Sequence, residues 1–114
     1  MASKKFNNVY IKDNFSIVGP LERDGLLKIY DLVMDDYYYG EKTFEQAEIK
    51  MQKIVLDNLL NKNKLTENKI DALIGGDLIN QTSISSYNAS KFRIPYLGVY
   101  SACATYAEEL IIGA

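Results

Sequence analysis

Residues 72–76, Ala-Leu-Ile-Gly-Gly, form a short and wholly apolar run in the middle of the chain. Such a run is typical of a strand that is buried on both faces, as strands of parallel sheets are. A strong helical pattern precedes it. Thr43 and Gln46 have the spacing of a capping box, and apolar residues recur at helical intervals from Phe44 to Leu59. A buried strand next to an amphipathic helix favours an α/β fold.

The rest of the chain continues this alternation. We expect strands at 6–11, 15–18 and 96–100, a long loop with one short helical turn at 21–40, a capped turn at 66–69, a helix at 83–92, and an apolar helix from 104 to the end. Strands that alternate with helices predict a mostly parallel sheet with helices on both faces.

The last of these helices carries apolar residues on more than one side: Ala104, Ala107, Leu110, Ile111 and Ile112. A helix that is apolar all round is normally buried inside a larger protein. We therefore expect the 114 residues to be the amino-terminal piece of a longer chain.

Composition excludes several classes of function. The chain has no His, so it can complete neither a Ser-His nor a Cys-His catalytic unit. Its single Cys allows neither an internal disulfide nor a Cys/His zinc site. Its net charge of -2 argues against nucleic acid as a partner. No apolar run approaches the roughly 18 residues of a membrane span, and the amino terminus lacks the apolar core of a secretory signal.

Cys103 is the residue with the clearest chemical potential. It stands where a predicted strand turns into a helix, and the dipole and free N–H groups of a helix amino terminus favour a thiolate or an oxyanion. The alternative is packing, because free cysteines are often buried and inert.

Polar residues also follow the apolar strand. Gly75 and Gly76 end it, and Asp77, Asn80 and Gln81 come directly after, where open α/β sheets bind their ligands. The glycines also suit a close backbone approach, and the polar residues equally suit capping of the next helix. Asp35 and Asp36 lack further spaced carboxylates, so a solvated loop is favoured there over a metal site.

Three blocks of sequence resemble the stage V sporulation protein AD family. In chain order they are Tyr39–Glu48 (YGEKTFEQAE), Gly76–Gln81 (GDLINQ) and Ile94–Thr105 (IPYLGVYSACAT). The Ser-Ala-Cys-Ala-Thr part of the third block is also similar to the nucleophile segment of thiolases and ketoacyl synthases.

The resemblance implies that residues 1–114 are the amino-terminal part of a thiolase-like domain, roughly the first third of a five-layered fold. It aligns Cys103 with the nucleophile position of the condensing enzymes. It implies a pocket for pyridine-2,6-dicarboxylic acid (dipicolinic acid), for which we expect these contacts: Cys103, Ser101, Thr105, Asp77, Asn80 and Gln81.

The same resemblance implies a spore protein that binds its ligand without catalysis and without a cofactor. It would act as a homodimer with other stage V sporulation membrane proteins, as a peripheral protein on the cytoplasmic face of the forespore inner membrane. Two alternatives stay open. One is acyl transfer, in which Cys103 attacks a thioester. The other is an assembly fragment without a ligand of its own.

Overall fold

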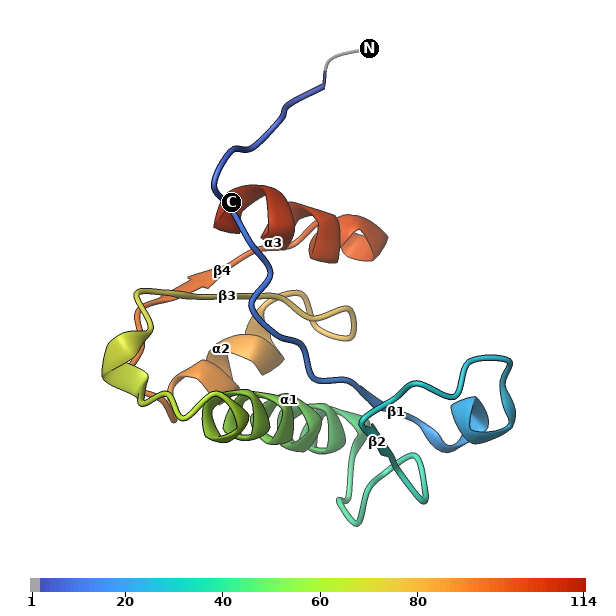
Figure 1. The fold of residues 1–114 in the computed structure, drawn as a ribbon. Coiled ribbons are helices and arrows are strands. Elements are labelled where there is room, and N and C mark those ends of the chain that lie inside the picture. The colour runs from blue at the N-terminus through green and yellow to red at the C-terminus, as the bar shows by residue number, and fades with distance from the viewer. Residues whose placement is uncertain (1–2) are drawn as a thin grey trace.

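The computed structural model describes residues 3–114, and its centre is a pair of parallel strands. β3 (Leu73–Gly75) pairs with β4 (Tyr96–Gly98), with Leu73 opposite Tyr96 and Gly75 opposite Gly98. α3 (Thr105–Gly113) lies over one face of this pair, and α1 (Phe44–Lys62) and α2 (Ser83–Ala89) lie on the other (Figure 1). The predicted α/β class, parallel pairing and helices on both faces are confirmed.

α1 begins where its sequence predicts. The backbone N–H of Gln46 donates to Oγ1 of Thr43 at 3.2 Å, which satisfies one of the free donors of the first turn. The Gln46 side chain accepts from the backbone N–H of Lys42 at 3.3 Å, one residue before the position that a capping box predicts. Lys62 ends the helix, as its charge favours.

The interior of the protein is small. The buried apolar side chains among the described residues are Met34, Ala47, Ile84, Ala89, Ile94 and Val99. Leu73 and Ile74 are half-buried, so β3 is less enclosed than its apolar sequence predicts. On α3, Tyr106 and Ile111 expose 69% and 61% of their surface, which is a large apolar area to leave in water.

A second pair of strands lies apart from the first. β1 (Ile17–Val18) pairs in parallel with β2 (Leu32–Val33), and a 3₁₀ turn at Pro20–Asp24 lies between them (Figure 1). The extended segment at 15–18 and the helical turn after it are confirmed, but β2 lies inside the segment predicted as a loop. Asp31 accepts from the backbone N–H of Ser16 at 2.8 Å, and this bond closes the pair.

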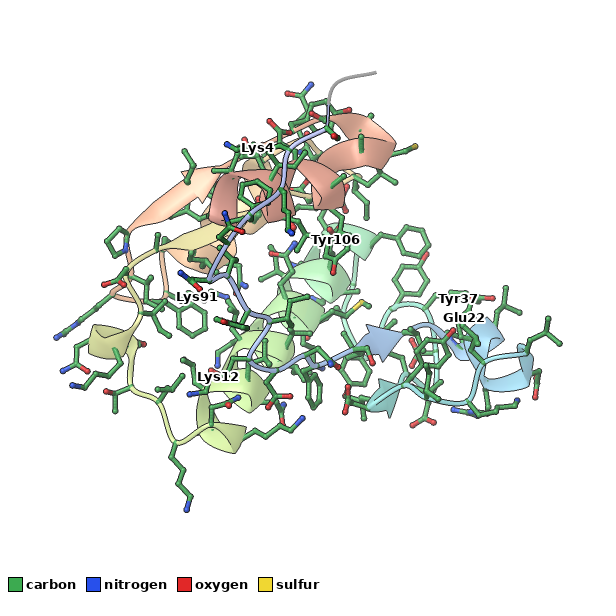
Figure 2. The ribbon with its side chains drawn as sticks, turned by 45° about the horizontal axis from the view of Figure 1, so that its top comes forward. Lys4, Lys12, Glu22, Tyr37, Lys91 and Tyr106 are labelled. Atoms are coloured by element: carbon green, nitrogen blue, oxygen red, sulfur yellow. The ribbon has the colours of Figure 1, made fainter. Side chains whose placement is uncertain are left out.

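The strand predicted at 6–11 is wrong, because this segment has no partner strand among the described residues. Tyr10 and Ile11 are 84% and 79% exposed. The segment is instead held just beyond its carboxyl end. There the Lys62 side chain donates to Asp13 at 2.8 Å, and this bond lowers the pKa of the Asp13 carboxyl. Figure 2 shows Lys12 beside α1 at this place.

The remaining predicted elements form with shorter bounds. A 3₁₀ turn covers Glu67–Lys69, although the Thr66 side chain makes no capping bond to it. α2 ends at Ala89 and β4 at Gly98, each before the predicted end. Within residues 3–114, no helix combines the length and the apolar character that crossing a membrane requires.

The Thr43 cap provides a test of how the fold is stabilised. We expect Thr43→Ala to lower the free energy of unfolding by about 1 kcal/mol, because Gln46 loses its acceptor. Thr43→Ser should stay within about 0.5 kcal/mol of the original protein, because it keeps the hydroxyl. Urea denaturation followed by circular dichroism measures the stability of both variants. Equal losses of stability in Thr43→Ala and Thr43→Ser would show that the hydroxyl cap does not stabilise the helix.

Candidate ligand site at the carboxyl ends of β3 and β4

Two turns leave the β3–β4 pair at the same edge, because parallel strands place their carboxyl ends together. Gly75 accepts a hydrogen bond from the N–H of Val99 at 3.1 Å, one residue beyond β4. A Cβ atom on Gly76 would come within 2.3 Å of the Val99 carbonyl oxygen and 2.6 Å of Cγ2 of Thr105. The predicted close backbone approach therefore occurs at Gly76, and it sets the two turns side by side.

Asp77 closes the first turn and is 4% exposed. Its Oδ1 accepts from the N–H of Asn80 at 2.9 Å, and its own N–H donates to the Gln81 carbonyl at 2.8 Å. Its Oδ2 accepts from the N–H and the hydroxyl of Ser85 in the first turn of α2, at 3.0 and 3.1 Å. The capping role considered for Asp77 is thus realised, while ligand contact by it stays a prediction.

Thr105 closes the second turn. Its buried hydroxyl donates to the Ala102 carbonyl at 2.7 Å and accepts from the N–H of Ser101 at 3.1 Å. The Ser101 hydroxyl donates to Glu108 on α3 at 2.6 Å. Ser101 and Thr105 were both predicted as ligand contacts, and in the structure their hydroxyls hold the turn together.

Four of the predicted residues are exposed at this edge: Asn80, Gln81, Ser101 and Cys103. Cys103 lies in a 3₁₀ turn (Ala102–Ala104) directly before α3 and is an exposed free thiol. This position agrees with the predicted strand-to-helix turn, and the packing alternative is not realised.

Each turn also contains a non-glycine residue in the left-handed region, with φ of +59° at Gln81 and +48° at Ala102. This conformation costs an L-residue roughly 1–2 kcal/mol. Strain of this kind collects at ligand-binding and catalytic turns. Sequence patterns did not reveal either position, because neither residue type favours positive φ.

Acidic residues of α3 belong to the site, and sequence reasoning missed them. Glu108 accepts from the Ser101 hydroxyl, and Glu109 lies near the backbone N–H of Gly76. Burial raises the pKa of Glu109, while the nearby backbone N–H of Gly76 opposes the rise. The only available signal was their place in the first two turns of a helix that follows Cys103.

The structure offers no metal site in residues 3–114, where no three His, Cys, Asp or Glu side chains are placed to share an ion. Asp35 pairs with Arg23 at 3.0 Å on the surface. Asp36 accepts from the backbone N–H groups of Tyr38 and Tyr39, both at 2.8 Å. Asp35 and Asp36 thus lie in a surface loop, as the sequence pattern favours.

Comparison with known proteins gives two matches. The sequence model of the family described as stage V sporulation protein AD matches residues 2–114. The stage V sporulation protein AD of Bacillus subtilis (strain 168) is 32% identical over 107 residues, which is 93% of this chain and 32% of that protein. The chain thus spans about a third of the length of this relative.

The contact at Gly76 can be tested by adding one methyl group. We expect Gly76→Ala to lower the free energy of unfolding by about 3 kcal/mol, because the Val99 carbonyl is backbone and cannot swing aside. Gly19→Ala is the matched control: nothing lies within 4 Å of its added Cβ and its φ is -72°. Urea denaturation compares the two, and equal stability of both variants would contradict the contact.

Proposed function

Because the chain belongs to the stage V sporulation protein AD family, we propose that it supplies part of a pocket for dipicolinic acid in a non-catalytic, thiolase-like spore protein. The pocket lies at the edge where the turns 76–82 and 101–105 meet. The rest of the pocket and of the fold would come from the other two thirds that the Bacillus subtilis relative has.

One observation carries this proposal: the parallel pairing of β3 and β4 brings two separately predicted sets of residues to one edge. Asn80 and Gln81 come from the first turn and Cys103 from the second. The carboxyl edge of parallel strands is where α/β proteins bind small ligands. The Gly76 contact keeps both turns at a fixed separation.

The chemistry of this edge suits a planar dicarboxylate. Carboxylates accept hydrogen bonds, and the exposed amides of Asn80 and Gln81 and the Cys103 thiol can donate them. The amino end of α3 adds a partial positive charge. The six predicted contacts include no Lys or Arg, so binding would rest on hydrogen bonds and the helix dipole rather than on ion pairs.

Absence of catalysis is part of the proposal. The chain contains no His to activate the Cys103 thiol. Of the acidic side chains in the site, Glu108 accepts from Ser101 and Glu109 lies near the N–H of Gly76. Neither is bonded to Cys103, which supports a role for this exposed thiol in contacting the ligand rather than in catalysis.

Charge variants of Gln81 test the pocket in the full-length protein. Gln81→Glu should weaken dipicolinate binding about tenfold, because it sets a negative charge against a dianion, whereas Gln81→Lys should strengthen it. Asn61→Asp is the control: it adds the same charge on an exposed position near the end of α1 and should leave binding unchanged. Equilibrium dialysis read by ligand absorbance measures each variant, and binding insensitive to both Gln81 changes would reject the pocket.

Acyl transfer is the second candidate, and the exposure of Cys103 at the amino end of α3 favours it. In that reaction the thiolate attacks an acyl-CoA thioester, a new thioester forms on Cys103, and free CoA leaves and takes up the proton. Donors at the amino end of α3 would hold the oxyanion.

Mass spectrometry of the full-length protein after incubation with acetyl-CoA distinguishes the two functions. Our proposal predicts no adduct on Cys103 of the original protein. An acetyl group on Cys103 that is absent from Cys103→Ser would instead establish acyl transfer.

We further propose that the protein acts as a homodimer, peripheral to the cytoplasmic face of the forespore inner membrane, together with other stage V sporulation membrane proteins. The exposed apolar side chains of α3, Tyr106 and Ile111 among them, support a protein partner on that face.

A further inference from the structure

Glu48 on α1 has a carboxyl group that the fold draws in from water without giving it a full set of partners. Its neighbour Ala47 is 2% exposed, and α1 packs against α2 along this stretch. Oε2 of Glu48 is shielded from water and receives no hydrogen bond from the described chain, while Oε1 accepts a bond of 3.4 Å from Gln52. Buried acceptors are nearly always paired in folded proteins, so this one requires an explanation.

The surroundings of Glu48 disfavour its ionised form. Burial raises its pKa, the negative charges of Asp77 and Glu45 raise it further, and the bond from Gln52 opposes the rise. The titratable groups on the elements around it are Tyr37 in the loop before α1, Glu45 on α1, Asp77 in the turn before α2, Tyr96 on β4 and Glu109 on α3. None of these groups carries a positive charge, and α2 contains no charged residue.

A second carboxyl, that of Glu109 on α3, is in a similar position. Glu48 and Glu109 both line a cavity of ≈ 380 Å³ beside β3, and no Lys or Arg of the described chain lines it. Burial raises the pKa of Glu109, with a smaller contribution from Glu108. α1 and α3 cover opposite faces of the β3–β4 pair (Figure 1), so each carboxyl bears on the packing of a different helix.

We propose that Glu48 and Glu109 form a proton-sensitive switch, which closes α1 and α3 onto the β3–β4 pair when the two carboxyls are neutral and loosens both helices when they ionise. A neutral carboxyl loses far less on leaving water than a carboxylate that has no cation beside it. The ionised form therefore favours states in which water reaches the side chain, and the cavity gives that water room to enter. Each carboxyl acts on its own helix, so the switch requires no contact between them.

The direction of the pH effect follows from the raised pKa values. A carboxyl with a higher pKa in the folded than in the unfolded protein binds its proton more tightly when folded. Its contribution to stability is therefore fully present below the ordinary value of 4.5 and is lost as pH rises through the raised value.

Two surface carboxyls act in the opposite direction and in a different range. A hydrogen bond from Lys62 lowers the pKa of Asp13, and hydrogen bonds from Ser16 lower that of Asp31. The stability that these two contribute is present above their ordinary value of 3.8 and is lost as pH falls through the lowered values. We therefore expect the protein to be most stable in the mildly acidic range between the two windows.

Urea denaturation of the full chain, followed by circular dichroism without any ligand, tests the switch. The urea concentration at the midpoint should rise as the pH falls from about 8 to about 5. Glu48→Gln keeps the shape and is neutral at both pH values, so its midpoint should exceed that of the original protein at pH 8 and should change less with pH. Glu109→Gln should also reduce the dependence, whereas Glu45→Gln, an exposed position on α1, should retain most of it.

Native-state hydrogen exchange locates the effect. After correction for the intrinsic pH dependence of exchange, the amides of α1 and α3 should be less protected at pH 8 than at pH 5. A midpoint in the original protein that does not rise from pH 8 to pH 5 would overturn the switch, and this measurement needs no variant to fold. The full rise in both Glu48→Gln and Glu109→Gln, or equal protection of the two helices at both pH values, would overturn it as well. Because no ligand is present, the result is independent of the dipicolinic acid pocket.

Discussion

The contact of Gly76 with the Val99 carbonyl and the Thr105 methyl group is the constraint on which the rest of the architecture depends. It leaves no room for a Cβ, so β3 and the turn after β4 come as close as two backbones can. The N–H of Gly76 lies near Glu109 on α3, and the hydrogen bond from Val99 to Gly75 completes the junction. One glycine thus links a strand, the Cys103 turn and the last helix.

Much of this arrangement could be predicted because its signals are local. The Thr43 cap and the turn at Cys103 depend on residues a few positions apart, and the structure has both where the sequence indicates. The apolar run at 72–76 identified β3 for the same reason. Family membership, too, followed from contiguous blocks of sequence and was then confirmed.

The parts that could not be predicted depend on contacts between distant segments. β2 exists because Leu32 bonds to the carbonyl of Ser16, a pairing that its own residues do not signal. The apolar residues at 6–11 look like a strand but find no partner in the described chain, so Val9, Tyr10 and Ile11 stay exposed. The packing of α1 against α2 also joins segments that are distant in the sequence, and no motif signals it.

Asp77 connects the two sides of β3. Its oxygens hold the turn at the ligand edge and the first turn of α2, and burial together with its negative charge raises the pKa of Glu48 on α1. Because one carboxylate both closes the turn at the edge and holds the start of α2, a change at Asp77 would disturb the turn and the helix together.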